Sequence, residues 1–445
     1  MNKKSVYVVT LGCSKNEVDS EIMLGILDKE NYYIAENLYE ANIIIVNTCG
    51  FIESAKEESI DAIWEMTKYK NQGQCEYLLL SGCLAQRYSK ELLNEIKEVD
   101  AIVGTGNIKE LNNILKNLDK EKGIIKIDNL NSQYLEGVER LNHSSTAYVR
   151  ISEGCDNFCS YCIIPSLRGK HRSRRIEDIV FEVEELSKNG VKEVVLIAQN
   201  TTDYGIDLYD EYSLAELLDR LNQIDRIKWI RVLYLYPDNI NDKLIKSIKE
   251  NEKVVKYLDI PLQHINDNVL KLMNRRTSKN QITSNIDKLR SEIPEIIIRT
   301  TFIVGFPGET KDDYMELYNF IRDTKFDKLG VFPYSKEEGT SAYRLPNQID
   351  DTIKEERKDT LMELQQEISK ELLADKIGEI FETLIEEKTD DKTYIGRTYM
   401  DNKEIDGVVY VTSESQLEVG LFYPVRIIDS LEYDLIGVLE DEFSK

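Results

Sequence analysis

Three cysteines in one short stretch, Cys155, Cys159 and Cys162, are the side chains best suited to hold a cofactor. They lie in the sequence CDNFCSYC, directly after a predicted strand. Soft thiolates select iron–sulfur clusters or zinc. A zinc site would normally take a fourth Cys or His, and the nearby His171 does not stand at a usual spacing. Because three thiolates on a four-iron cluster leave one iron open to a small molecule, we expect such a cluster here.

A second set of cysteines, Cys13, Cys49 and Cys83, is spread along the N-terminal part of the chain. Each ends an apolar run, in the sequences TLGC, VNTC and SGC. The carboxyl ends of parallel strands share one edge of a sheet, so we expect these thiols to form a second three-thiolate site. The alternative is three buried core cysteines, but those would fall inside the strands. Cys75 lies in the polar loop NQGQCEY, and we interpret it as incidental.

The composition limits the classes of protein to which the chain can belong. Its formal net charge of -24 disfavours generic binding to nucleic-acid phosphates. Seven cysteines, an odd number in a long chain, argue against a disulfide framework. No apolar run reaches the roughly 18 residues of a membrane span, and the N-terminus lacks the pattern of a signal peptide. We therefore expect a cytoplasmic protein that does not associate with membranes.

The elements that must position the second triad form an alternating series. Continuous apolar strands separated by amphipathic helices predict a parallel α/β sheet domain over residues 1–118. The predicted strands are 6–13, 43–49, 77–83 and 100–107, and the predicted helices are 17–30, 55–70 and 88–98. Residues 119–145 are polar and are interpreted as a linker that contains a small amount of extended structure.

The first triad belongs to a longer series over residues 146–376. Six predicted strands alternate with helices and suggest an incomplete parallel barrel, although periodicity alone does not distinguish it from an open sheet. These strands are 147–154, 193–200, 229–237, 256–263, 295–307 and 328–335. Residues 377–445 contain short strands broken by Gly, Asp and Asn, which predicts a small all-β barrel. The whole chain is therefore of the α/β class with a C-terminal β-barrel.

With both triads described, the chain resembles the methylthiotransferases, a branch of the radical S-adenosylmethionine superfamily. The resemblance covers nearly the whole chain and implies an N-terminal methylthiotransferase domain, a radical S-adenosylmethionine core and a C-terminal TRAM domain. Within the branch, the chain is most similar to enzymes that methylthiolate an aspartate of the twelfth small-subunit ribosomal protein. The motifs that carry this similarity are CDNFCSYC, LGCSKNEVDSE, VNTCGFIESAKEESID, SLRGKHRSRR, LIAQNTTDYG, DIPLQH, RTTFIVGFPGET and YSKEEGTSA.

This resemblance implies two [4Fe-4S] clusters, one on each triad, and S-adenosylmethionine both as radical source and as methyl donor. The cluster at Cys155, Cys159 and Cys162 would bind S-adenosylmethionine and cleave it reductively, and the resulting radical would remove a hydrogen from the substrate β-carbon. The cluster at Cys13, Cys49 and Cys83 would present the sulfur. Such chemistry must be carried by cofactors. An electron donor of the flavodoxin or ferredoxin type is also implied.

Other residues near the predicted site have less specific patterns. Gly305, Gly308 and Glu309 in IVGFPGET follow a strand without the phosphate-loop lysine spacing, and we interpret them as a turn that shapes the S-adenosylmethionine pocket. His264 should face the same mouth, where packing or hydrogen bonding is the simplest role and catalysis the alternative. The basic run Leu167 to Arg175 either contacts carboxylates of substrate or cofactor, or is a solvated helix entry.

The charge of the C-terminal barrel indicates the class of substrate. Residues 375–445 contain 18 Asp and Glu against 7 Lys and Arg. An RNA-binding barrel should carry a basic face, whereas an acidic barrel would attract a basic ribosomal protein or the small subunit and repel free tRNA. The nearest alternative is a tRNA-base methylthiotransferase with the same machinery. A more distant alternative is a non-catalytic redox sensor or cluster carrier, which would not cleave S-adenosylmethionine.

Overall fold

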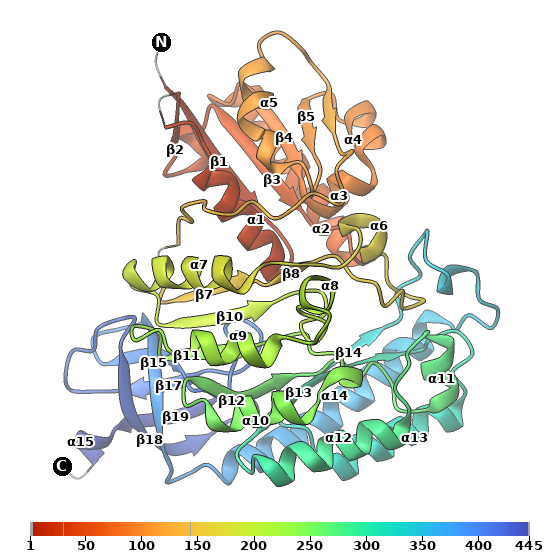
Figure 1. Ribbon diagram of the computed structural model, residues 1–445, viewed down its shortest axis with the longest axis vertical. Helices are drawn as coiled ribbons and strands as arrows, with labels where there is room; N and C mark the ends of the chain where they lie inside the picture. The colour runs from red at the N-terminus through yellow and green to blue at the C-terminus, as the bar shows by residue number, and fades with distance from the viewer. Residues whose placement is uncertain (1–2, 30, 143, 444–445) are drawn as a thin grey trace.

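In the computed structural model, which describes residues 3–29, 31–142 and 144–443, two parallel sheets and one closed barrel follow each other along the chain (Figure 1). This architecture confirms the predicted fold class. One apolar cluster runs from the N-terminal sheet through the inner face of the second sheet into the barrel. Within the described residues, none of the helices is long and apolar enough to cross a membrane.

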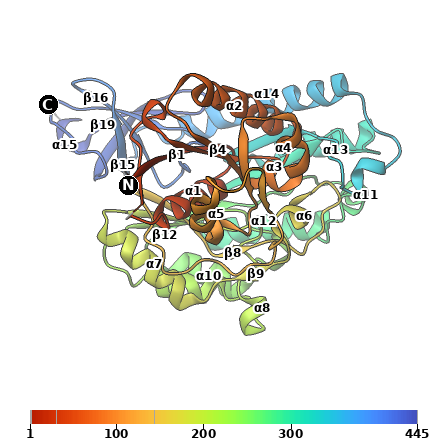
Figure 2. The same ribbon diagram turned by 90° about the horizontal axis from the view of Figure 1, so that it is seen from above.

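The N-terminal sheet is parallel, with the order β2-β1-β3-β4-β5-β6. Helices α1 and α5 cover one face and helix α2 covers the other, as Figure 2 shows from above. The strands are β1 (Lys4–Thr10), β2 (Tyr32–Ile34), β3 (Ile43–Thr48), β4 (Tyr77–Ser81), β5 (Val99–Val103) and β6 (Ile124–Lys126). The helices are α1 (Ser14–Gly25), α2 (Glu53–Gln72), α3 (Gly82–Arg87), α4 (Ser89–Glu95) and α5 (Leu111–Asn117).

The two edge strands of this sheet were missing from the sequence prediction. β2 and β6 are three residues long, too short to show a hydrophobic period. β6 comes from the segment interpreted as a linker, so the first sheet continues past residue 118. The domain boundaries themselves stay predictions.

The second sheet is also parallel, with the order β14-β13-β12-β11-β10-β7 and no pairing between its two edges. Its six strands are β7 (Thr146–Arg150), β10 (Glu193–Ile197), β11 (Trp229–Val232), β12 (Val254–Asp259), β13 (Ile297–Val304) and β14 (Lys328–Pro333). Its outer face packs against helices in one large apolar cluster. Those helices are α7 (Ile176–Lys188), α9 (Leu214–Leu221), α10 (Asp242–Glu250), α12 (Lys279–Glu292), α13 (Lys311–Thr324) and α14 (Asp351–Ala374).

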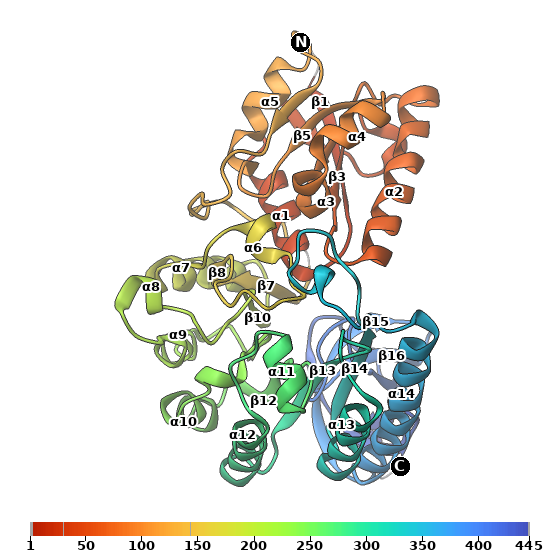
Figure 3. The ribbon, with the colours of Figure 1, turned by 90° about the vertical axis from the view of Figure 1, so that its right-hand side faces the viewer.

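Short elements connect the carboxyl ends of these strands. They are the β8 (Ser152–Glu153) and β9 (Arg172–Ser173) pair and the helices α6 (Ile164–Arg168), α8 (Ile206–Tyr209) and α11 (Asp267–Leu272). Helix α6 packs against α3 of the first domain, and Figure 3 shows it between the two sheets. The cysteine loop before α6 therefore faces the N-terminal domain.

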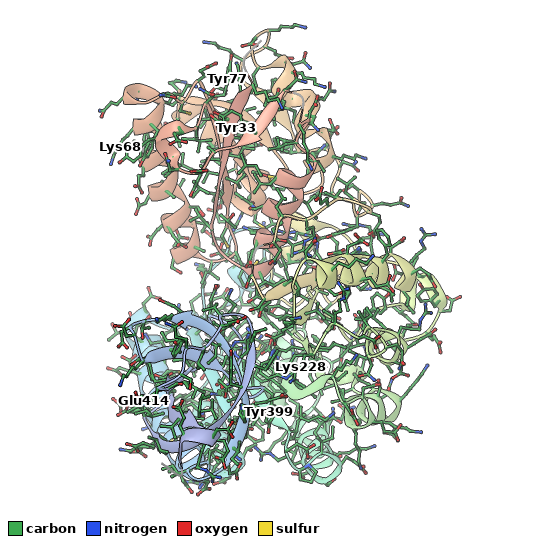
Figure 4. The ribbon with its side chains drawn as sticks, turned by 90° about the vertical axis from the view of Figure 1, so that its left-hand side faces the viewer. Tyr33, Lys68, Tyr77, Lys228, Tyr399 and Glu414 are labelled. Atoms are coloured by element: carbon green, nitrogen blue, oxygen red, sulfur yellow. The ribbon has the colours of Figure 1, made fainter. Side chains whose placement is uncertain are left out.

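The C-terminal segment closes into a five-stranded barrel in the order β15-β16-β17-β19-β18, followed by the short helix α15 (Glu440–Phe443). The strands are β15 (Ile380–Lys388), β16 (Thr393–Arg397), β17 (Val409–Thr412), β18 (Phe422–Ser430) and β19 (Leu435–Leu439). The barrel docks on the core through the buried Glu193, whose carboxylate accepts hydrogen bonds from Arg231 and from Arg397 of the barrel. In Figure 4, Tyr399 and Lys228 lie at this junction, and Glu414 lies on the outer side of the barrel.

Candidate active site between the two cysteine triads

The N-terminal triad lies at the carboxyl ends of three adjacent strands. β1, β3 and β4 are in register, with Thr10 opposite Asn47 and Asn47 opposite Ser81. The chain then reaches Cys13, Cys49 and Cys83 within three residues of that row. The Cys83 thiol lies close enough to the other two to interact electrostatically with both. The structure therefore brings together the three thiols that strand ends alone had suggested.

Glycines beside these cysteines let the three loops approach each other. Gly12 has φ 86°, and a Cβ built on it would lie 2.6 Å from the Cβ of Cys49. A Cβ on Gly82, with φ 88°, would lie 2.3 Å from the carbonyl oxygen of Thr48. Neither position accepts a side chain without moving the backbone, and L residues avoid this φ. A glycine next to each of the three cysteines is a signal of this close approach that is visible in the sequence.

The Asn16 side chain connects the loop that carries Cys13 to the loop that carries Cys49. Its Nδ2 donates to the carbonyl oxygens of Leu11 at 2.8 Å and Thr48 at 3.0 Å, and its side chain is fully buried. Its Oδ1 accepts a 2.8 Å hydrogen bond from Arg168 Nη2. Because buried polar atoms cost free energy when unpaired, this amide holds the loops in one arrangement.

The second triad occupies the loop between β8 and α6. Gly154, with φ 74°, starts the loop, where a Cβ would lie 2.0 Å from the Lys170 carbonyl oxygen. The Cys155 amide donates to Gly169 and the Cys162 amide donates to Cys159. The Cys162 thiol interacts electrostatically with Cys159 and Cys155, so this loop also gathers its three sulfurs.

Cys159 has polar and charged neighbours. The side chains of Tyr161, Tyr236 and Arg275 lie close enough to its thiol to interact with it electrostatically. Arg275 is buried, stacks 4.0 Å from the centroid of Tyr236 and donates to the Pro261 carbonyl oxygen at 2.7 Å. Polar and charged groups beside a ligand sulfur tune the potential of a cluster.

A buried ion-pair network joins the two triads. Arg168, at the end of α6, donates to Asp19 Oδ2 at 3.0 Å and Glu153 Oε2 at 3.1 Å, and its guanidinium lies close enough to the Cys83 thiol to interact with it electrostatically. Arg150 donates to the same two acids, at 2.7 and 2.6 Å. The network therefore ties α1 of the first domain to the cysteine loop of the second.

This network also clarifies the basic run Leu167 to Arg175. Arg168, His171 and Arg174 are buried, and Arg174 pairs with Glu136 and Glu182. Arg175 is exposed and pairs with Asp178 at 2.8 Å. Arg168 and Arg174 are thus neutralised by acids of this chain and are not free to meet a ligand. Lys170 is exposed and Arg172 donates to backbone carbonyl oxygens, so contact of these two with carboxylates of substrate or cofactor stays a prediction.

The thiols of both triads are available as ligands. All six are free, and burial raises the pKa of Cys83 and Cys155 to about 11. Cluster binding must therefore displace protons from them. Among the residues described, no three Cys, His, Asp or Glu side chains converge to hold a single metal ion. Cysteines on a cubane cluster bind different irons and need not converge on one point, so the donor set fits a cluster at each triad.

The turn with Gly305, Gly308 and Glu309 lies behind the second triad. Phe306 stacks edge-on against Tyr161, with 6.5 Å between the ring centroids. Both glycines adopt positive φ, and the buried Glu309 carboxylate accepts from the Phe306 amide at 3.0 Å and lies 3.2 Å from Arg357. Through these two contacts Glu309 stabilises the turn. Contact of the turn with S-adenosylmethionine stays a prediction.

His264 is fully buried behind the same turn. Its Nδ1 accepts a 3.0 Å hydrogen bond from the Asn266 amide, and its Nε2 lies 3.9 Å from Glu309 Oε1. This is the packing and hydrogen-bonding role expected as the simplest one. Among the described residues, no interaction connects His264 with either triad. The alternative catalytic role of His264 therefore has no support from its contacts.

Comparison with known families divides the chain into the same three parts as the structure. Residues 5–104 match the Uncharacterized protein family UPF0004, residues 149–321 match the radical SAM superfamily, and residues 377–439 match the TRAM domain. The first match covers most of the first sheet, the second most of the core, and the third the closed barrel.

Full-length relatives are similar over the whole chain. "Ribosomal protein uS12 methylthiotransferase RimO" of Clostridioides difficile (strain 630) is 53% identical over 97% of this chain and 98% of the relative. Proteins of the same name from Clostridium botulinum (strain Eklund 17B / Type B) and Acetivibrio thermocellus are 51% and 49% identical, over 100% of both chains in each case.

Solved structures share the fold at low sequence identity. The radical S-adenosylmethionine methyltransferase TsrM from Kitasatospora setae is 12% identical, with a TM-score of 0.55, over 74% of this chain and 73% of that chain. The cobalamin-dependent S-adenosylmethionine radical enzyme OxsB is 15% identical, with a TM-score of 0.52, over 83% of this chain and 56% of that chain.

Proposed function

The chain belongs to the radical S-adenosylmethionine methylthiotransferase family of the RimO relatives, and from this premise we propose that it methylthiolates the β-carbon of an aspartate of ribosomal protein uS12. Membership of this family makes it a sulfur-transferring enzyme that uses S-adenosylmethionine and a [4Fe-4S] cluster. The finer assignment is two [4Fe-4S] clusters, one on each triad. The observation that carries it is the meeting of three strand-end thiols with the CDNFCSYC loop at one domain interface.

The cofactors supply the chemistry that side chains cannot. Bound at these triads, the clusters and S-adenosylmethionine would provide a carbon-centred radical, a sulfur atom and a methyl group. The electron would come from a donor of the flavodoxin or ferredoxin type. The net change replaces a C–H bond of the substrate with a C–S bond and adds a methyl group to that sulfur.

The role of this chain's own residues is to hold both ligand sets at a fixed separation. Asn16 fixes the loops of the N-terminal triad, and Arg168 connects them to the other cysteine loop. Tyr161, Tyr236 and Arg275 place polar and charged groups beside Cys159. Because radical chemistry needs the reacting groups within contact, this rigid connection is the contribution that the fold can make.

The charges of the barrel support a basic protein substrate rather than free tRNA. Arg397 is buried against Glu193, Arg426 pairs with Glu440 and Lys392 pairs with Glu414. The exposed barrel acids outnumber these cations. A barrel with its cations already engaged offers little to a phosphate backbone, which is bound through Lys and Arg.

The test presents both substrates to the same enzyme. Purified, anaerobically reconstituted protein is incubated with S-adenosylmethionine and reductant, together with isolated uS12, small subunits or tRNA. The proposal expects a methylthio group on one aspartate of uS12 and none on tRNA, by mass spectrometry. Modified tRNA with untouched uS12 would replace it with the tRNA-base activity, and reductive cleavage of S-adenosylmethionine excludes a pure cluster carrier.

A further inference from the structure

Lys15 is a buried cation without a carboxylate partner. It follows Cys13 by two residues, its residue exposure is 8%, and its Nζ lies 3.4 Å from the centroid of the Tyr234 ring. In the ranges that the structure describes, it has no carboxylate within 4.0 Å and forms no hydrogen bond through its ammonium. Lysines are rarely buried to this degree unless they are paired, so this position favours an anionic partner.

Most neighbouring buried cations of this interior have acid partners. Arg299 lies 2.9 Å from Asp259, and Lys328 lies 2.6 Å from Asp401. Arg150 and Arg168 share Asp19 and Glu153. Among the described residues, Lys15 pairs with no acid, and neither does the buried Arg275, which instead donates to the Pro261 carbonyl oxygen.

The ring beneath Lys15 is held in an unusual backbone conformation. Tyr234 has φ 61°, a region that bulky residues rarely adopt. Its amide donates to Asp259 Oδ2 at 3.1 Å, and its carbonyl oxygen accepts from the Thr201 amide at 3.1 Å. Strained residues persist where the surroundings fix them, and they concentrate at functional sites. The ring is therefore a fixed platform for the ammonium.

This platform lies near both triads. Tyr236, two residues after Tyr234, lies close enough to Cys159 of the core triad to interact with it electrostatically, whereas Lys15 follows Cys13 of the N-terminal triad by two residues. A substrate carbon that loses hydrogen near one triad and gains sulfur from the other must lie between them. Lys15 therefore belongs to the region in which the reacting side chain would be held.

We propose that Lys15 binds the side-chain carboxylate of the substrate aspartate and so selects aspartate over its uncharged isostere. The inference rests on the proposed function and adds a specificity-determining residue to it. The bound carboxylate completes the ion pair that the protein lacks, and Tyr234 holds the ammonium at the required position. An asparagine side chain would leave the buried charge unpaired, which a site built for an ion pair disfavours strongly.

The experiment measures binding, not turnover. Reconstituted enzyme without reductant is titrated with isolated uS12 and with uS12 in which the modified aspartate, located beforehand by mass spectrometry, is replaced by asparagine. We expect the native enzyme to prefer the aspartate form by about tenfold or more, about 1.4 kcal/mol per tenfold. Lys15→Met should bind both forms within about twofold, and Lys15→Arg should keep the preference because it keeps the charge. Lys116→Met, which removes a surface lysine paired with Asp28, is the matched control and should keep it too.

Three results would overturn the inference. Lys15→Met could keep the preference, Lys15→Arg could lose it while retaining its iron, or Lys15→Met could weaken binding of S-adenosylmethionine with an unchanged aspartate preference. The last result would assign Lys15 to the cofactor's carboxylate. If Lys15→Met loses iron, the aspartate preference measured with Lys15→Arg is the remaining test of the inference. Failure of the proposed function can be distinguished from failure of this inference. In that case the native enzyme would leave uS12 unmodified in the activity assay.

Discussion

Arg168 Nη2 lies 3.0 Å from Asp19 Oδ2, although the two residues are 149 positions apart in the sequence. This contact connects α1, which begins directly after Cys13, to α6, which begins directly after the CDNFCSYC loop. Both side chains are almost completely buried, with exposed side-chain fractions of 1% and 2%. The distance between the two triads is therefore set by one buried ion pair and its neighbours.

The first prediction concerns this ion pair. Arg168→Met leaves Glu153 and Asp19 short of one partner in a buried position, and removing one member of a buried pair costs about 3–5 kcal/mol. Urea unfolding should show a loss of that order in the free energy of unfolding. Arg175→Met, which removes an exposed arginine paired with Asp178, should leave it nearly unchanged, because exposed ion pairs contribute little. Equal effects of the two variants would contradict a special role of the network.

The second prediction concerns Gly12. Gly12→Ala places a methyl group against Cys49 and forces an L residue into a positive φ, so the N-terminal loops must separate. Reconstituted protein should fall from about eight irons to about four, since one cubane is lost and the other kept. Gly137→Ala is the matched control, because Gly137 has φ 71° but no atom within 4 Å of its added Cβ. It should retain the full iron content.

The third prediction separates the triads by role. Cys49→Ala should still cleave S-adenosylmethionine reductively but should form no methylthiolated product. Variants at Cys155, Cys159 or Cys162 should lose both activities. Cys75 is buried and its thiol donates to the Tyr77 carbonyl oxygen at 3.2 Å, away from both triads, so Cys75→Ala should match the native enzyme. Normal product yield from Cys49→Ala would remove the N-terminal triad from the mechanism.

The placement of both triads could be anticipated from sequence because each depends on local rules. Strand ends in a parallel sheet share an edge, which brought Cys13, Cys49 and Cys83 together. Two kinds of feature could not be anticipated. The edge strands β2 and β6 are too short for periodicity, and Arg168 meets Asn16 and Asp19 only through tertiary packing of two domains. The sequence shows the positive charge of the run Leu167 to Arg175, but it does not show which acids of the chain pair with it.

The fourth prediction concerns docking of the barrel at Glu193. Burial alone would raise the pKa of this carboxyl, but Arg397 and Arg231 outweigh it and hold the pKa at about 2, against an ordinary value of 4.5. A lowered folded-state pKa stabilises above pH 4.5, and this contribution is lost as the pH falls toward 2. Glu193→Gln should therefore be about 3 kcal/mol less stable at neutral pH, and the gap should shrink below pH 4.5.

The measurement is urea unfolding of iron-free protein across this pH range, because acid would also release the clusters. Glu432→Gln is the matched control, since Glu432 is exposed on the barrel and forms no ion pair among the described residues. Its curve should run parallel to the native one. A constant gap between native protein and Glu193→Gln down to pH 2 would show that the carboxylate charge does not hold the barrel.

The last prediction concerns the acidic face of the barrel. A basic ribosomal protein should be attracted by exposed acids, and this attraction should weaken as salt shortens the Debye length below about 10 Å. Reversing Glu387, Asp391, Glu418 and Glu432 to Lys should weaken uS12 binding by about tenfold or more at low salt and flatten its salt dependence. The same number of reversals on exposed acids of α2, at Glu57, Glu58, Asp61 and Glu65, changes the net charge equally. Because long-range net charge is then matched, a larger loss from the barrel variant assigns the contact to the barrel, whereas equal losses would leave only general attraction.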